Sequence, residues 1–277
     1  MTMPHENVTL VWGYRDKKPL EFRKLVKDLQ DRLRPLTDQY QYTSRGIDDM
    51  HITVLGCEAN EVNGELYSRP LLQHLFGSRV FASLSTHDLA GKQIDFNQLA
   101  EIAHIAFDTP ITVQFGGYVE SSWPPLLYPG WSLYRMSFYF GFLAPNFVLT
   151  GWPTPLWGWH LMGFRALAEK ANVMHKYHSK GEWPPDGDAY AVIGDIEGLK
   201  VHPHPRHYGE IDIFPADITA ILEEIRDWLS RNHVTVEFTG ENVEFIAYND
   251  TRLSSIRGCP LPLSRVRSGD DIRNLYY

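Results

Sequence analysis

The fold is decided by residues 49–56, which read DMHITVLG. Aliphatic and β-branched residues dominate this run, so it predicts a buried β-strand. Side chains two positions apart on a strand point to the same side, which places His51 and Thr53 together on one face. An imidazole beside a hydroxyl can transfer a proton and hold a developing negative charge. The run therefore predicts either a strand that carries chemistry or a core strand that merely contains a histidine.

The residues before this strand predict another strand and a helix. Residues 8–14 (VTLVWGY) are β-branched and aromatic, as is typical of strands. Pro19 suits the first turn of a helix, and Pro35 ends it. One face of this helix carries its large apolar residues, which are Phe22, Leu25, Val26, Leu29 and Leu33. This part of the chain thus predicts a strand–helix–strand unit whose helix packs on a sheet.

The rest of the chain continues to alternate between the two kinds of element. Strands are predicted at residues 110–118, 132–140, 188–196, 233–238 and 243–248, and helices at 95–106, from 161 onwards and from 217 onwards. The turn at 239–242 is expected to close a hairpin between the last two strands. Residues 58–91 have weak periodicity and predict only short elements, near 71–75 and 80–84.

Composition indicates a globular protein that acts on small ligands. Hydrophobic residues make up 43% of the chain, which is ample for a core. Acidic residues outnumber basic ones by 34 to 26, and this net charge of −8 disfavours duplex nucleic acid but allows a locally basic cleft. Cys57 and Cys259 lie far apart, which fits a reducing, cytoplasmic setting. Neither a signal peptide nor a membrane span is expected, and the apolar stretch 131–159 is expected to be core.

A four-residue pattern occurs twice in the sequence. Residues 51–54 (HITV) and 233–236 (HVTV) both read His-x-Thr-hydrophobic, and both follow a predicted helix. The pair resembles the signature of the two-histidine (2H) phosphoesterase superfamily. The resemblance implies an α+β fold in a single domain, 1–277, with two pseudo-repeated lobes and a basic C-terminal tail. The lobes would span about 1–120 and about 131–250 and the tail 251–277, with two small, mostly antiparallel sheets around a central cleft.

The resemblance also implies a chemistry. His51 and His233 would act as general acid and base on a phosphodiester, while Thr53 and Thr235 hydrogen-bond the phosphate oxygens. Imidazole suits this task because its ordinary pKa of about 6.5 lets it give or take a proton near neutral pH. The expected function is a metal-independent phosphodiesterase without a cofactor. Its substrate would be a small nucleotide or an oligonucleotide such as short RNA, with a 2′,3′-cyclic phosphate or a 2′,5′ linkage.

The large separation of the two motifs leaves a second alignment open. In it, residues 189–196 form the strand that should carry the second motif, and that strand contains no histidine. His175 or His178 would then replace the missing group, or the chain would have kept the fold and lost the activity. The alternative function is a noncatalytic protein that binds a nucleotide or another small ligand on a degenerate 2H scaffold.

Other polar residues are candidates for binding the substrate. His175, Tyr177 and His178 lie among lysines and would suit an anion, or they would simply cap a helix end. Arg135, inside a predicted apolar strand, is expected either to form a buried ion pair or to contact phosphate. His233 can also be read as a histidine that favours a helix C-terminus.

A histidine-rich stretch raises a third class of function. Residues 201–210 (VHPHPRHYGE) contain three histidines and a glutamate, as a metal site would. Two prolines force an extended course, however, and the spacing matches no zinc pattern. A solvated loop is the favoured interpretation, with a metal-dependent hydrolase as the rival.

Overall fold

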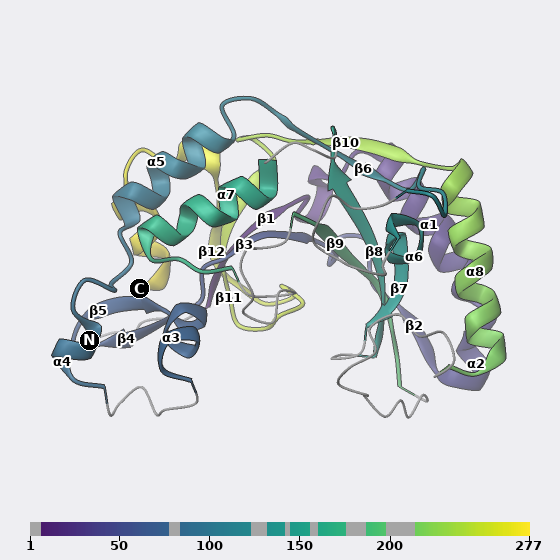
Figure 1. The fold of residues 1–277 in the computed structure, drawn as a ribbon, viewed down its shortest axis with the longest axis horizontal. Helices are drawn as coiled ribbons and strands as arrows, with labels where there is room; N and C mark the ends of the chain where they lie inside the picture. Colours follow the sequence, from purple (N-terminus) through teal and green to yellow (C-terminus); the bar gives the residue numbers. More distant parts are fainter. Residues whose placement is uncertain are drawn as a thin grey trace.

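The computed structural model describes residues 7–77, 84–122, 132–141, 145–155, 160–175, 187–197 and 214–277. Figure 1 shows a mixed α/β fold with an arched outline, built on one large antiparallel sheet. Its strands are β1 (Val8–Trp12), β2 (Tyr42–Ser44), β3 (Ile52–Gly56), β6 (Ile111–Phe115), β7 (Phe138–Gly141), β8 (Asn146–Pro153), β9 (Ala189–Ile196), β10 (Val234–Phe238), β11 (Val243–Tyr248) and β12 (Ile256–Pro262). A separate small sheet pairs β4 (Ala59–Val62) with β5 (Glu65–Ser68).

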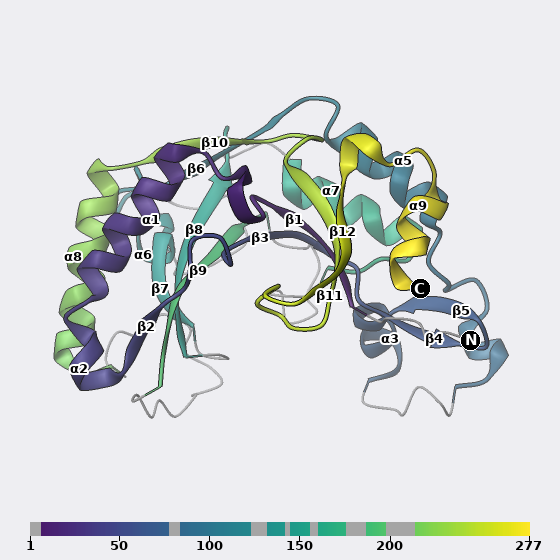
Figure 2. The same cartoon turned by 180° about the vertical axis from the view of Figure 1, so that it is seen from behind.

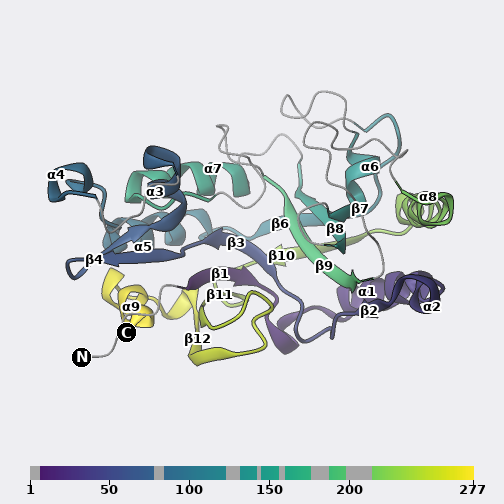
Figure 3. The ribbon, with the colours of Figure 1, turned by 90° about the horizontal axis from the view of Figure 1, so that it is seen from below.

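The large sheet consists of two groups of strands that meet at one place. The strand order is β10-β6-β8-β9-β3-β1-β11-β12, with β2 beside β9 and β7 beside β8. Strands β3 and β9 share a single paired position, Ile52 opposite Ala191, whereas their other neighbours pair over several residues. We call this junction of β3 and β9 the seam. Figure 3 shows β9, β3 and β1 side by side between two sets of helices.

The helices form two groups at opposite ends of the sheet. They are α1 (Leu20–Leu33), α2 (Leu36–Tyr40), α3 (Arg69–Phe76), α4 (Thr86–Leu89), α5 (Phe96–Ala106), α6 (Leu133–Ser137), α7 (His160–Ala168), α8 (Ala216–Arg231) and α9 (Gly269–Arg273). Helix α1 lies beside α8 and packs on β9 and β10, while α5 contacts α7 and α9 (Figure 2). No helix within the described ranges combines the length and apolar character that crossing a bilayer requires.

A continuous apolar core lies under one face of the sheet. Trp12 stacks on Phe238 with ring centroids 4.8 Å apart and meets the edge of Phe22 at 5.3 Å. The same core contains Ile52 and Ala191 from the seam. Full burial of each large apolar side chain contributes about 1.5 to 3 kcal/mol, so this face fixes the register of both strands. The opposite face carries a smaller cluster of Val11, Tyr14, Ile246, Tyr248 and Leu253.

Most elements predicted from periodicity are present, and several predictions about arrangement are wrong. The predicted strands near residues 8–14, 51–56, 110–118, 188–196, 233–238 and 243–248 are confirmed, as are the helices after Pro19, at 95–106 and after Asp217. Among the described residues, ten strands form one large sheet, and only β4 and β5 form a small one, rather than two small sheets. Strands β10 and β11 form no hairpin, because β10 pairs with β6 and β11 pairs with β1 and β12. As a result, β10 lies beside β6 in the sheet, far from β11.

Local structure explains the remaining differences. Residues 132–140 form a short helix followed by a strand, because Ser132 caps α6 by accepting the Arg135 N–H at 3.2 Å. The short element predicted near residues 71–75, whose type was left open, is the helix α3, and residues 78–83 lie outside the described part. The β4–β5 hairpin turns at Asn63 and Gly64, both with positive φ. An Asn-Gly pair is a strong hairpin signal, and it was the missed clue in this region.

Candidate functional site

The His-x-Thr motif lies at the seam, on the face opposite the core. His51 immediately precedes β3, and both its side chain and that of Thr53 are half-buried. Thr53 lies opposite Val11 of β1, which belongs to the smaller cluster on that face. Because Ile52 points into the core, the alternation of the strand directs His51 and Thr53 to the other side. The predicted shared face of these two residues therefore follows from the register of β3.

Strand β9 contributes a different pair of side chains to the same face. Ala191 lies opposite Ile52 and also points into the core, so its neighbours Tyr190 and Val192 point the other way. Both are half-buried. The Tyr190 hydroxyl donates to Oδ2 of the buried Asp188 at 2.5 Å. The seam thus presents a histidine and a threonine from one strand, and a tyrosine and a valine from the other.

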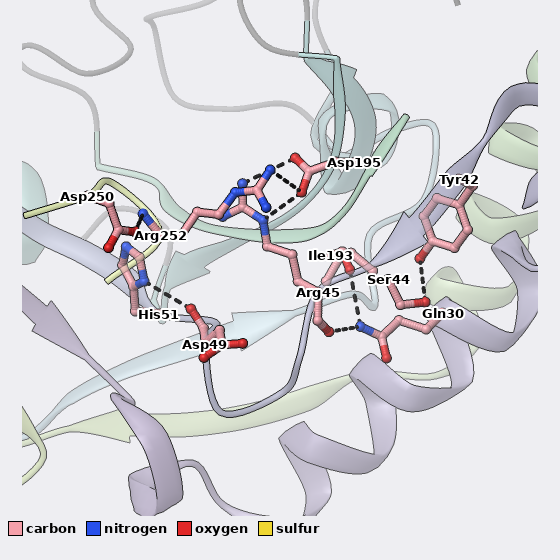
Figure 4. Close-up of polar contacts among 10 residues, drawn as sticks. All are labelled: Gln30, Tyr42, Ser44, Arg45, Asp49, His51, Ile193, Asp195, Asp250 and Arg252. Carbon is pink, nitrogen blue, oxygen red and sulfur yellow. Dashed lines mark hydrogen bonds and ion pairs between the residues drawn. The ribbon is translucent and has the colours of Figure 1, made fainter. Parts of the chain in front are cut away.

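Two arginines converge on the Asp195 carboxylate (Figure 4). Arg45 donates through Nε and Nη2 to the two Asp195 oxygens, both at 3.2 Å. Arg252 approaches the same carboxylate with its Nη2 at 3.5 Å from Oδ2. We call His51, Arg45, Asp195 and Arg252 the seam cluster. Its charged members come from three separate segments of the chain.

Arg45 is held in place by its backbone. It follows β2, in which Thr43 pairs with Asp195 of β9. The Arg45 N–H donates to the Ile193 carbonyl at 3.0 Å, and the Arg45 carbonyl accepts from Gln30 Nε2 at 2.7 Å. Gln30, on the inner face of α1, also donates to the Ile193 carbonyl at 3.1 Å. The Gln30 amide thereby links α1 to β9 and to the residue that follows β2. These bonds fix the backbone position from which the Arg45 side chain extends.

Arg252 belongs to the loop between β11 and β12. Asp250 organises this loop by accepting backbone N–H groups from Arg252 at 2.9 Å and Ser255 at 2.7 Å. Partial burial opposes ionisation of Asp250, but hydrogen bonds from the loop outweigh it and lower the pKa of the carboxyl. Leu253 is buried, and its carbonyl accepts from the Tyr14 hydroxyl at 3.2 Å. The loop is anchored on both sides of Arg252, whose own side chain is 63% exposed.

Burial and positive charge keep His51 neutral. Burial is the largest influence and lowers the pKa of His51 to about 4, and the cations Arg45 and Lys18 act in the same direction. The Asp49 carbonyl, 3.4 Å from Nδ1, and the Asp250 carboxylate partly oppose this shift. Burial also lowers the pKa of Lys18 to about 8, so its ammonium remains largely charged at neutral pH. The neutral imidazole of His51 therefore lies in the field of two cations, Arg45 and Lys18, which the Asp250 carboxylate partly offsets.

A buried arginine binds backbone carbonyls of β3 beside the seam. Arg165, on α7, is fully buried and donates to the Val54 carbonyl at 2.9 Å and the Thr53 carbonyl at 3.1 Å. Its Nη1 reaches the Asp188 carbonyl at 3.0 Å. These bonds replace part of the missing ladder between β3 and β9. Sequence analysis missed this residue, although an arginine within the apolar pattern of a predicted helix was a visible signal.

His175 also supports β3, at Gly56, the end of the strand opposite to His51. Its side chain is 2% exposed, and its Nδ1 accepts the Gly56 N–H at 3.1 Å. The predicted helix that was expected to carry His175 ends earlier, because α7 stops at Ala168 and Asn172 adopts a left-handed conformation. Tyr177 and His178 lie outside the described residues, as do residues 201–210.

The second His-x-Thr motif is not brought to the first. His233 and Thr235 are exposed at the start of β10, the edge strand of the sheet. Three strands separate β10 from β3, which corresponds to about 19 Å at the usual spacing of strands. His233 therefore does not face His51 across one site, and the expected pairing of these histidines does not fit the structure.

Arg135 also differs from expectation. It lies on α6, its side chain is exposed, and it is neither in a strand nor in a buried ion pair. Its charge helps to lower the pKa of Arg226 on α8, although burial of Arg226 is the main cause of that shift. Within the described residues, no group of three or more histidine, cysteine, aspartate or glutamate side chains is arranged to hold a metal ion.

Comparisons with known proteins add no identity. No protein-family model matches the chain, and neither the curated proteins nor the solved structures contain a match to it.

Proposed function

We propose that the chain binds a small phosphorylated ligand at the seam cluster, on a bilobal scaffold organised like that of the 2H phosphoesterases. The observation that carries this proposal is the pairing of Ile52 with Ala191, which sets His51 beside cations but supplies no second histidine. Guanidinium and ammonium groups are the usual partners of phosphate. The alternative function that the sequence left open is thus the better supported one.

The topology supports the bilobal scaffold. β1, α1 and β3 form a strand–helix–strand unit, and so do β8, α7 and β9. In each unit the two strands are antiparallel neighbours, and the units meet through β3 and β9. Each unit's helix also reaches across: α1 packs on β9, and Arg165 of α7 bonds to β3. These relations agree with a pseudo-two-fold axis through the seam.

Under such an axis, two residues of β9 would stand where the second motif is expected. About the Ile52–Ala191 pair, His51 corresponds to Tyr190 and Thr53 corresponds to Val192. A phenol has an ordinary pKa near 10, and the Tyr190 hydroxyl already donates to Asp188. Valine has no hydroxyl with which to hold a phosphate oxygen. Proton transfer by a matched pair of groups is therefore not supported, whereas binding is.

Turnover by a metal-independent phosphodiesterase is the second candidate. Its support is the state of His51, because a neutral imidazole can accept a proton from an attacking hydroxyl. Thr53 on the same face offers a donor to a phosphate oxygen. The low pKa makes His51 a weak base, so any turnover would be slow.

Calorimetry combined with product analysis tests both candidates. The purified chain is titrated with 2′,3′-cyclic AMP and with adenosine 3′-monophosphate, and the recovered nucleotide is analysed chromatographically. We expect saturable binding and unchanged nucleotide. If the wild type hydrolyses 2′,3′-cyclic AMP and His51→Ala does not, the phosphodiesterase would be supported in place of the binding protein. Absence of binding to both nucleotides would reject the proposed ligand class.

A further inference from the structure

The Asp195 carboxylate lies where two guanidiniums point. Arg45 contacts both of its oxygens, and Arg252 contacts one of them from the β11–β12 loop. The side chains of Arg45 and Asp195 are 15% and 22% exposed, so water still reaches this contact. A single carboxylate cannot neutralise two guanidiniums, and the trio retains one positive charge.

This arrangement matches a phosphate better than it matches a carboxylate. The planar fork of arginine binds carboxylate and phosphate oxygens with the same two-point geometry. A phosphate monoester carries up to two negative charges near neutral pH, because its second pKa is about 6. It also has three terminal oxygens, enough to contact Arg45 and Arg252 together. A phosphate monoester would therefore satisfy both guanidiniums that Asp195 satisfies only in part.

The contacts differ in how easily they can be exchanged. Arg252 is 63% exposed and meets Asp195 at 3.5 Å, and exposed ion pairs of this kind contribute only about 0 to 1 kcal/mol. Its loop is nevertheless fixed on both sides, by Asp250 and by the buried Leu253. Arg45 is fixed through its backbone to Ile193. The two guanidiniums would stay near one another when the carboxylate between them moves away.

We propose that Asp195 is a placeholder, and that the phosphate monoester of the ligand takes its position between Arg45 and Arg252. This inference rests on the proposed function and deepens it, since it names the groups that recognise the phosphate and the charge that competes with it. Asp195 thereby limits the affinity for the ligand. It holds the two arginines together in the free protein and is displaced on binding.

The direction in which one substitution changes the affinity for the ligand tests this role of Asp195. Asp195→Asn keeps the size of the side chain and removes its charge, and we expect its affinity for adenosine 3′-monophosphate to rise about two- to fivefold, the equivalent of one partly exposed ion pair. The control is Asp31→Asn, which makes the same change of net charge at an exposed carboxylate on α1 that contacts Lys27. We expect the control to bind like the wild type. Melting temperatures of all variants verify folding.

A second variant keeps the proposal testable if Asp195→Asn fails to fold. Arg252→Gln changes a largely exposed side chain, and we expect it to bind adenosine 3′-monophosphate more weakly than the wild type. Equal binding by Arg252→Gln, or weaker or unchanged binding by Asp195→Asn, overturns the placeholder while leaving the proposed function in place. Absence of binding in the wild type and in Asp195→Asn alike rejects the proposed function as well.

Discussion

Strands β3 and β9 meet at the seam and carry different side chains. Each contributes one core residue, Ile52 or Ala191, to the same paired position. On the opposite face, β3 presents His51 and Thr53, whereas β9 presents an aromatic and an aliphatic side chain. The His-x-Thr pattern thus occurs on the β3 side of this position, whereas β9 contributes the Asp195 carboxylate farther along the strand. The difference teaches that the cations near this face come from segments outside the two strands, Arg45 after β2 and Arg252 in the β11–β12 loop.

The largest expected effect concerns the support of β3. Arg165→Ala removes the donor to three backbone carbonyls and leaves them buried beside a cavity. We expect a loss of about 3 to 5 kcal/mol in the free energy of unfolding, measured by urea denaturation. Arg135→Ala, at an exposed arginine, is the control and should change it by less than about 0.5 kcal/mol. A loss below 1 kcal/mol for Arg165→Ala would show that β3 does not depend on it.

The next largest effect concerns the contribution of Arg45, which lies outside the motif, to the affinity for the ligand. Arg45→Gln removes the charge that contacts both Asp195 oxygens. We expect the affinity for adenosine 3′-monophosphate to fall about tenfold or more, because a hydrogen bond to a charged group contributes roughly 1.5 to 3 kcal/mol. Calorimetry measures the change, and Arg267→Gln in the C-terminal segment is the matched control. Equal affinities for the two variants would exclude Arg45 from the site.

A smaller effect follows from the low pKa of His51. In the unfolded chain this imidazole takes up a proton near pH 6.5, whereas in the folded chain it does so only near pH 4. The unfolded state therefore binds more protons between these values, and the contribution of His51 to stability is lost as the pH falls from 6.5 to 4. We expect His51→Gln to reduce the drop in melting temperature between pH 7 and pH 4.5. An identical drop in both proteins would contradict the assigned shift.

The smallest effect is expected at the second motif. His233→Ala alters an exposed side chain at the edge strand. We expect unchanged affinity for adenosine 3′-monophosphate and a change in the free energy of unfolding within about 0.5 kcal/mol. Loss of binding in His233→Ala, without loss of stability, would restore this histidine to the site.

Sequence patterns predicted the elements because each one buries a stripe of apolar residues. The helix α1 and the strand β3 could be recognised in this way, and so could the shared face of His51 and Thr53. Pairing between distant strands leaves no such local pattern. The turn after β10 has the length of a hairpin turn, yet β10 and β11 diverge into different groups of the sheet.

The rest of the candidate site depends on the same long-range pairing. Arg45 and Asp195 are 150 residues apart in sequence and meet because β2 pairs with β9. Arg252 joins them only through the fold of its loop. Residues 233–236 match the His-x-Thr motif in sequence. That His233 lies beside an edge strand could not be predicted without the strand order.

The most direct test records the imidazole signals of the histidines by nuclear magnetic resonance during titration with adenosine 3′-monophosphate. A phosphate bound at the seam cluster should shift the His51 signals and raise the pKa of His51 from about 4, because the anion offsets the charge of Arg45 and Lys18. The signals of His233 should remain unchanged. A shift at His233 with none at His51 would contradict binding at the seam.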